Sequence, residues 1–283
     1  MSLANSPDAE GMDETDYALG RSHSEYDRLI EQAELLRSPT ERVLRAAGIS
    51  LGMRVLDVGC GVGDVSFLAA ELVGTDGAVV GVDLDGDALQ VADRRQTEQG
   101  TTNVSFRQGD PRVMEFDQIF DAAIGRFVLM YMSDPAAALR LMADRVRVGG
   151  VLVFHEWVTS GAIVPASTQP MLASLQELIR STFERSGANL HTGAELYASF
   201  LGAGLEPNPQ PLAEVAITMN REAGYRRWEL FVRGLSPKII EYGLATSSEL
   251  DSQLRRLREE VAAGRGPVPV SWLMIGQWGR TLP

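Results

Sequence analysis

A glycine-rich segment at residues 55–64, Val-Leu-Asp-Val-Gly-Cys-Gly-Val-Gly-Asp, holds the residue types best suited to ligand chemistry. Its first half is a short apolar run typical of a buried strand, and its alternating glycines allow a tight turn before the following helix. At such a turn the backbone can approach a ligand closely, at the carboxyl edge of a parallel sheet. The segment therefore predicts a site for a nucleotide-like ligand.

The spacing of the glycines separates two kinds of nucleotide site. A dinucleotide fingerprint, Gly-x-Gly-x-x-Gly, needs a third glycine where this chain has Asp64. A carboxylate at that helix start would repel a pyrophosphate. Asp57, at the end of the preceding strand, also suits a cationic group better than a phosphate. The turn therefore disfavours a dinucleotide.

Two further acidic turns follow the next apolar runs. Gly81-Val82-Asp83-Leu84 closes one run, and Gln108-Gly109-Asp110-Pro111 closes the other. Each acid has a plain structural alternative. Asp83 could be an ordinary strand-ending residue, and Asp110 could belong to a simple Gly-Asp-Pro turn.

The elements that must position these residues alternate between short apolar runs and helical stripes from residue 53 onward. This alternation is typical of βαβ units in a mainly parallel sheet, and right-handed crossovers favour a doubly wound α/β fold. The five expected strands are residues 54–58, 78–82, 104–107, 121–125 and 151–155, with late strands at 214–219 and 271–278.

With these motifs, residues 40–160 resemble the class I S-adenosylmethionine-dependent methyltransferases, whose first motif is an acid followed by Gly-x-Gly-x-Gly. The segment looks most like the small-molecule branch related to the ubiquinone and menaquinone biosynthesis enzymes. The resemblance implies a Rossmann-like, seven-stranded, mostly parallel sheet. It also implies S-adenosyl-L-methionine as cofactor and S-adenosyl-L-homocysteine as product.

The resemblance also implies roles for particular residues. Asp83 would accept hydrogen bonds from both ribose hydroxyls, Leu84 would lie on the adenine face, and Asp110 would accept from the adenine amino group. Three roles stay open for Arg126, which departs from the family's usual small or polar residue: a contact with the cofactor carboxylate, a contact with a substrate acid, or an ion pair at the sheet edge. The expected cofactor-binding residues are Tyr26, Asp57, Gly59, Cys60, Gly61, Asp83, Leu84, Gly109, Asp110, Arg126 and Phe127.

Two residues at the end of the fifth strand are candidates for catalysis. His155 and Glu156 stand at the carboxyl edge, where a general base could serve a hydroxyl or protonated nitrogen acceptor. The alternative is that one packs against a helix and the other bonds to a loop. We expect no metal, because three histidines and one cysteine are too few for a zinc site of standard composition.

The remaining chain predicts a cover over this edge. We expect a disordered acidic tail at 1–16, helices at 17–50 that cover the cofactor with Tyr17 or Tyr26, and a methyltransferase domain at 51–283. Ser38-Pro39 predicts the start of a second N-terminal helix. Helical insertions at about 160–190 and 222–265 would form a lid if the sixth strand is parallel and the seventh antiparallel. Its aromatic residues favour an apolar or planar substrate: Trp157, Phe183, Tyr197, Trp228 and Phe231.

The charge and cysteine content of the chain limit the classes of partner that it is expected to bind. Thirty-eight acidic against 26 basic residues give a net charge of −12, which disfavours nucleic acid and anionic membrane surfaces. A single cysteine excludes an intrachain disulfide, and no apolar run reaches the length of a membrane span. We expect a cytoplasmic protein that methylates a small molecule. A noncatalytic S-adenosylmethionine-binding protein and an NAD(P)-dependent oxidoreductase are the alternatives; the sequence does not indicate the acceptor atom or the oligomeric state.

Overall fold

The computed structural model describes residues 23–159, 169–264 and 268–283. The expected tail at 1–16 and the expected cofactor cover by Tyr17 lie outside the described residues. Within the described ranges, no helix is long and apolar enough to cross a membrane.

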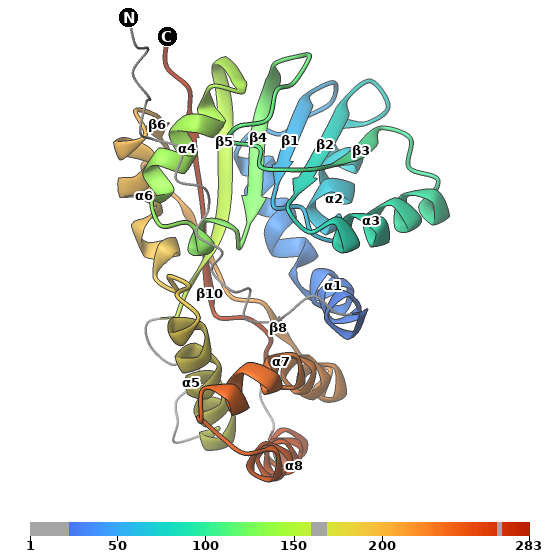
Figure 1. Cartoon of the computed structure of the whole chain (residues 1–283), viewed down its shortest axis with the longest axis vertical. Coiled ribbons are helices and arrows are strands. Elements are labelled where there is room, and N and C mark those ends of the chain that lie inside the picture. Colours follow the sequence, from blue (N-terminus) through green and yellow to red (C-terminus); the bar gives the residue numbers. More distant parts are fainter. Residues whose placement is uncertain (1–22, 160–168, 265–267) are drawn as a thin grey trace, which may run out of the picture.

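A central sheet organises the chain (Figure 1). Its first five strands are parallel, and the long β10 (Leu273–Arg280) runs antiparallel beside β5. The prediction of a doubly wound, mostly parallel α/β fold is therefore confirmed. The strand order is β3 (Val104–Gln108), β2 (Ala78–Asp83), β1 (Arg54–Val58), β4 (Phe120–Arg126), β5 (Val146–Val158), β10 and β6 (Glu206–Pro207), with β7 (Leu212–Glu214) also paired to β10.

The sixth strand differs from the expectation at 214–219. It is split into β6 and β7, which both pair antiparallel with β10 and therefore run parallel to β5. Proline lacks the N–H that a strand ladder needs, and Pro209 and Pro211 separate the two pieces. Only Glu214 of the expected strand joins the main sheet. Ile217–Thr218 forms β8, which pairs with β9 (Val268–Pro269) in a separate small sheet.

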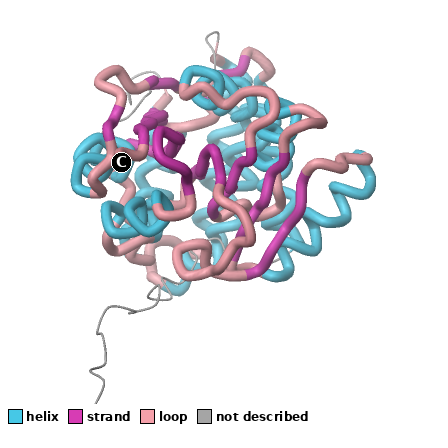
Figure 2. The backbone as a smooth tube through the Cα atoms, turned by 90° about the horizontal axis from the view of Figure 1, so that it is seen from above, coloured by secondary structure: helices cyan, strands magenta, loops and turns pink. Residues whose placement is uncertain are grey.

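Helices cover both faces of the sheet (Figure 2). Alternation along β1 assigns its side chains to the two faces: Val55 packs in the cluster with α2, whereas Leu56 and Val58 pack in the cluster with α4 and α6. The bounds of these helices are α2 Asp64–Val73, α4 Pro135–Ala143 and α6 Thr192–Gly202, while α3 Gly86–Gln99 packs beside β2 and β3.

The N-terminal segment forms one helix, α1 (His23–Ala46), so the expectation of a second helix beginning at Pro39 is wrong. A proline inside a helix costs one backbone hydrogen bond, yet α1 continues through it. Leu36 and Val43, on either side of Pro39, are buried against the rest of the protein. This packing outweighs the local signal for a helix start.

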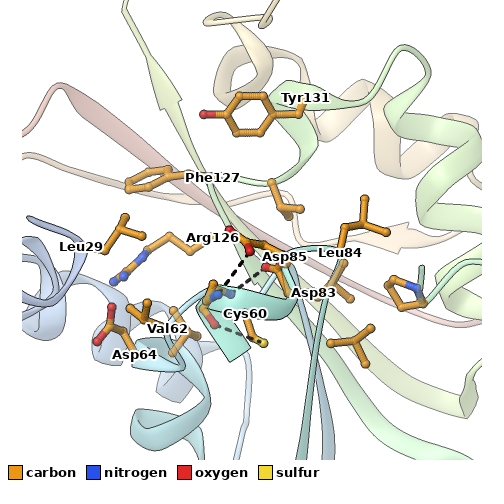
Figure 3. Close-up of a pocket in the computed structure, with 18 of the residues that line it drawn as sticks. Leu29, Cys60, Val62, Asp64, Asp83, Leu84, Asp85, Arg126, Phe127 and Tyr131 are labelled. Carbon is orange, nitrogen blue, oxygen red and sulfur yellow. Dashed lines mark hydrogen bonds between the residues drawn. The ribbon is translucent and has the colours of Figure 1, made fainter. Parts of the chain in front are cut away.

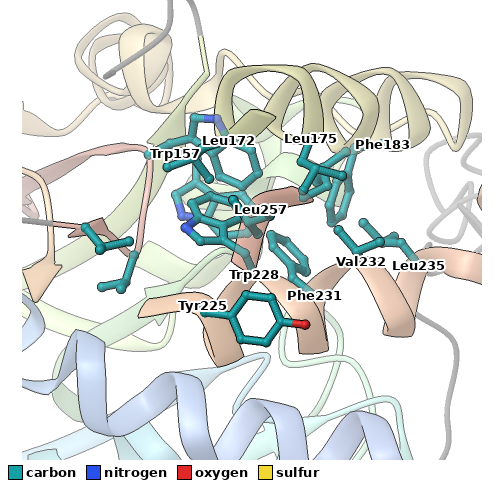
Figure 4. Close-up of a cluster of buried hydrophobic side chains, with 14 of the residues drawn as sticks. Trp157, Leu172, Leu175, Phe183, Tyr225, Trp228, Phe231, Val232, Leu235 and Leu257 are labelled. Carbon is teal, nitrogen blue, oxygen red and sulfur yellow. The ribbon is translucent and has the colours of Figure 1, made fainter. Parts of the chain in front are cut away.

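Beyond the carboxyl edge of the sheet, α5 (Pro170–Arg185), α7 (Arg221–Glu241) and α8 (Ser247–Ala263) form a helical layer (Figure 1). These helices share a core that is rich in aromatic rings (Figure 4). Phe183, Trp228 and Phe231 are buried inside that core, and Tyr197 lies exposed on α6. Of the five aromatic residues expected around the substrate, only Trp157 lines the cavity described below.

Candidate cofactor and substrate site

A cavity opens at the carboxyl ends of β1, β2, β3 and β4 (Figure 3). Parallel strands bring their ends to one edge of a sheet, so turns far apart in sequence meet there. The cavity is lined by every expected cofactor residue except Asp57: Tyr26, Gly59, Cys60, Gly61, Asp83, Leu84, Gly109, Asp110, Arg126 and Phe127.

The Asp83 carboxylate joins the first two motifs at the floor of the cavity. One of its oxygens accepts the Gly61 N–H at 2.7 Å, and the other accepts the Asp85 N–H at 2.9 Å. Gly61 has φ +52°, and a Cβ built there would meet no neighbouring atom within 4 Å. Gly59 is constrained differently, because a Cβ there would lie 2.6 Å from the Val128 side chain. The turn therefore needs both glycines, one for its conformation and one for close packing.

Asp57 does not reach the cavity, so the structure does not place it as a cofactor contact. Its side chain is 1% exposed, on the face of β1 that it shares with Val55. There its carboxylate accepts the Ser66 hydroxyl of α2 at 2.6 Å. Burial raises the pKa of Asp57 to about 7, although the Ser66 bond opposes that shift. Asp57 thus ties the sheet to α2 beneath the glycine turn.

Helix α1 closes one side of the cavity through Tyr26. The Tyr26 hydroxyl donates to Asp85 at 3.0 Å, and the Tyr26 ring is almost completely buried. Asp85 also accepts the N–H groups of Asp87 and Ala88 as the N-cap of α3. Asp85 therefore links α1 to the start of α3.

Asp110 follows β3 at the cavity edge. Its carboxylate forms a bidentate pair with Arg112, with oxygen–nitrogen distances of 2.6 to 3.0 Å. Burial acts to raise the pKa of Asp110, but the Arg112 hydrogen bonds outweigh burial and hold it below its ordinary value. Asp110 therefore stays a charged acceptor near neutral pH.

Arg126 ends β4 and lies on the same side of the cavity as Leu29 and Asp64 (Figure 3). It donates to the Thr40 hydroxyl of α1 at 3.1 Å. Burial lowers the pKa of Arg126, and the charges of Asp64 and Asp57 oppose this. Asp64 forms its ion pair with Arg95, at 2.7 Å. Arg126 thus places positive charge at the end of the cavity beside the glycine turn.

Phe127 forms an aromatic wall with Trp157, their ring centroids 4.3 Å apart. Its backbone has φ +58°, a strained conformation for a residue with a Cβ, and its N–H donates to the His155 carbonyl at 3.0 Å. Strain of this kind clusters at functional sites. The sequence placed Phe127 near the cofactor but held no signal for this backbone conformation.

His155 and Glu156 are buried and do not line the cavity. Burial lowers the pKa of His155 to about 3, with a further contribution from the Arg126 charge. Glu156 accepts the N–H groups of Val128 and Leu129, both at 2.9 Å, and so holds the turn that follows β4. Their expected role as general base stays a prediction, without a cavity contact to support it.

Five polar residues of the cavity wall were not among the expected site residues: Arg28, Gln32, Asp64, Asp85 and Tyr131. The first two lie four residues apart on the otherwise apolar face of α1, a helical spacing that could have revealed them. Tyr131 belongs to the short helix η1 (Leu129–Tyr131), which the sequence did not indicate.

A parallel sheet with a glycine-rich turn and carboxylates at its carboxyl edge defines a nucleotide-binding α/β protein of the Rossmann-like class. A family model described as "Methyltransferase domain" matches residues 49–204, and the chain belongs to this family. It is an S-adenosylmethionine-dependent methyltransferase, as the resemblance implied. The oxidoreductase alternative finds no support.

Characterised relatives fall in the small-molecule branch. The chain is 33% identical over 149 residues to the aklanonic acid methyltransferase DauC of Streptomyces sp., covering 52% of this chain and 67% of that one. It is 30% identical over 209 residues to the 2-phytyl-1,4-naphtoquinone methyltransferase of Synechococcus elongatus, covering 71% and 84%. For the ubiquinone/menaquinone biosynthesis C-methyltransferase UbiE of Cellvibrio japonicus, identity is 34% over 116 residues, 40% of this chain and about half, 47%, of the relative.

Solved structures share the fold at low identity. A putative methyltransferase from Bacillus halodurans aligns with TM-score 0.58 at 18% identity, over 87% of this chain and 100% of that one. The YcgJ protein of Bacillus subtilis aligns with TM-score 0.56 at 20% identity, over 87% and 99%. These likenesses support the Rossmann-like architecture.

Proposed function

We propose that this protein transfers a methyl group from S-adenosylmethionine to a small apolar or aromatic acceptor by direct in-line displacement. The observation that carries the proposal is a cavity whose wall has two unlike parts. One part is the Asp83–Gly61 turn, and the other is the Phe127–Trp157 wall. A cofactor and an apolar acceptor can meet in such a cavity.

The residues present fit the cofactor. Asp83 would accept from the ribose hydroxyls and Leu84 would lie against the adenine, with Asp110 at the adenine amino group. The open space above Gly61 leaves room for a ligand against the backbone. Arg126 would bind the methionine carboxylate, because it supplies a cation beside the glycine turn. Tyr26 would cover the ribose side from α1.

When bound, S-adenosylmethionine would supply a methyl group on a positively charged sulfur, and that sulfur would keep the electron pair of the carbon–sulfur bond that breaks. The protein then has to align the acceptor and exclude water. Alignment alone accounts for about 7–11 kcal/mol of barrier reduction in well-oriented reactions. Phe127 and Trp157 would hold the flat face of an acceptor, while α1 would shield the cavity from solvent. The helices α5, α7 and α8, which are the described part of the lid expected from 160–190 and 222–265, would complete this cover.

The names of the relatives support an acceptor of this class. One is named for ubiquinone and menaquinone biosynthesis, one for 2-phytyl-1,4-naphtoquinone and one for aklanonic acid. A quinone ring is flat, which suits an aromatic wall.

The test is calorimetry of the full chain with S-adenosylhomocysteine and, in parallel, NAD, followed by a turnover assay. The assay would measure S-adenosylhomocysteine release with a panel of naphthols, naphthoates and reduced quinones. We expect micromolar binding of S-adenosylhomocysteine, no binding of NAD, and turnover with at least one flat acceptor. Cofactor binding with no turnover across the panel would favour the noncatalytic alternative.

A further inference from the structure

A buried group of polar side chains joins α1 to α7 at the wall of the cavity. We call it the arginine cluster; it consists of Glu25, Arg28, Gln32 and Arg227, each between 1% and 4% exposed. Arg28 donates to both carboxylate oxygens of Glu25 at 2.7 Å. The Gln32 amide oxygen accepts from Arg28 and from Arg227, again at 2.7 Å in each case.

Arg227 has no carboxylate partner among the described residues. The carboxylate in the cluster is that of Glu25, and Arg28 already engages both of its oxygens. The Nε and Nη1 atoms of Arg227 are buried and have no acceptor among the described residues. Burial lowers the pKa of Arg227 well below its ordinary value, and the neighbouring charge of Arg28 adds to this effect. A buried cation with unused donors is destabilising unless an anion reaches it.

Two members of the arginine cluster line the cavity in which an acceptor would lie, and Arg227 lines the cavity that adjoins it. Arg28 and Gln32 line the main cavity together with Phe127, Tyr131 and Trp157. Arg28, Gln32 and Arg227 also line an adjoining cavity. Both guanidinium groups lie over the Phe231 ring, at 5.0 Å for Arg28 and 4.5 Å for Arg227, which holds them in place.

The other charged groups at the adjoining cavity do not supply the missing anion. Glu31 and Glu34 lie at its outer rim on α1. Glu31 is half-exposed and receives two hydrogen bonds from Arg226. Glu34 is exposed, and neither carboxylate contacts Arg227 within the described residues.

Trp157 adds a second donor at the same end of the main cavity. Its indole Nε1 is buried and has no acceptor among the described residues. Indole nitrogen can only donate, as can a guanidinium. Both side chains therefore call for an acceptor-rich ligand group.

We propose that the arginine cluster recognises an oxyanion, a carboxylate or a phosphate, on the methyl acceptor, which makes the acceptor a small flat acid. This inference rests on the proposed methyltransferase function and specifies its substrate class. Arg227 donates to the oxyanion through Nε and Nη1. Glu25 and Gln32 orient Arg28, whose charge adds to the attraction.

The experiment measures binding of matched probes to the full chain saturated with S-adenosylhomocysteine. The probes are hydroxynaphthoate, hydroxynaphthamide and naphthyl phosphate, which share a ring system and differ in charge. We expect at least one anionic probe to bind about tenfold or more tightly than the amide, since hydrogen bonds between charged groups are the stronger ones. The better of the two anionic probes identifies the oxyanion. Equal affinity for all three, or no binding by any, overturns the proposal.

Matched variants locate the effect. Arg227→Met should bring the ratio of anion to amide affinity to about one, and Arg227→Lys should retain part of it. The control is Arg226→Met, which removes the adjacent exposed arginine and should leave the ratio unchanged. S-adenosylhomocysteine affinity should stay the same in every variant. If the unaltered protein did not bind S-adenosylhomocysteine, the proposed function would be wrong. An unchanged ratio of anion to amide affinity in Arg227→Met would contradict this inference alone.

Thermal stability separates recognition from a structural role. Without probe, Arg227→Met should be at least as stable as the unaltered protein, because an unbalanced buried charge is removed. Two results together would show that Arg227 is a structural residue. Arg227→Met would melt several degrees lower than the unaltered protein, and no anionic probe would stabilise the unaltered protein. Arg227→Gln provides the same comparison if the methionine variant does not fold.

Discussion

The Asp83 carboxylate accepts the Gly61 N–H at 2.7 Å, so the acid that ends β2 also holds the glycine turn after β1. This bond joins two motifs that are 22 residues apart. One side chain therefore fixes the glycine turn and supplies the carboxylate that we propose binds the cofactor.

Asp83→Ala should weaken S-adenosylhomocysteine binding by about 1–3 kcal/mol, because ribose hydroxyls would lose their acceptor and the Gly61 N–H its partner. Calorimetry measures the change. Asp87→Ala is the control, since Asp87 is exposed on α3 and does not line the cavity. Equal affinity in the Asp83 variant and the control would contradict the assignment.

Arg126→Met should lower affinity for S-adenosylhomocysteine about tenfold to a hundredfold and leave affinity for methylthioadenosine unchanged. The second ligand lacks the amino-acid carboxylate that Arg126 is proposed to bind. Titration with both ligands thus separates a carboxylate contact from a general disturbance of the cavity. Parallel losses for the two ligands would assign Arg126 to supporting α1 through Thr40 instead.

His155 should make the protein less stable at acid pH. Its pKa is about 3 in the folded protein against 6.5 ordinarily, so between these values the unfolded chain binds more protons. The free energy of unfolding then falls as pH falls from about 6.5 towards 3, by up to about 1.4 kcal/mol per pH unit. Urea unfolding at several pH values should show a shallower fall for His155→Leu. Identical slopes would mean that His155 takes up a proton readily in the folded state.

Glu156 should act with the opposite sign. Burial raises its pKa to about 7 from 4.5, despite the hydrogen bonds from Leu129 and Val128, so the folded protein binds more protons between these values. Its contribution to stability is full below about pH 4.5 and is lost as pH rises through about 7.

Glu156→Gln keeps an oxygen for the Val128 and Leu129 N–H groups but cannot ionise. Its stability relative to the unaltered protein should therefore increase between about pH 4.5 and pH 7, as thermal unfolding would show. Glu98→Gln, at an exposed position on α3, is the matched control. If the stability of Glu156→Gln changed with pH in the same way as that of Glu98→Gln, the raised pKa of Glu156 would be ruled out.

Most of the architecture was predictable because its signals are local. Alternating apolar runs and helical stripes indicate parallel strands with crossover helices, and the glycines at 59 and 61 mark the turn that needs them. The errors also have local causes. Ser38-Pro39 has the pattern of a helix start, but the packing of Leu36 and Val43 carries α1 through it.

Side-chain direction was harder to predict. Asp57 and Asp83 both end strands, yet Asp57 points into the α2 face and Asp83 into the cavity. His155 and Glu156 lie near the end of β5, at the expected edge, but both are buried and neither lines the cavity. A strand's period gives the alternation of faces and does not show which neighbour covers each face.

By itself, the sequence determined the class of fold, the glycine turn and the acids at the carboxyl edge, because backbone conformation and apolar period depend on near neighbours. The tertiary structure alone decided that Gln32 and Arg227, 195 residues apart, share a hydrogen bond in a buried cluster. Such a contact depends on how α1 packs against α7. Because the two residues are far apart in the sequence, no local pattern indicates that they are buried together. The same packing buries Arg227 with two donor atoms that have no acceptor among the described residues, and from these we infer an acidic acceptor.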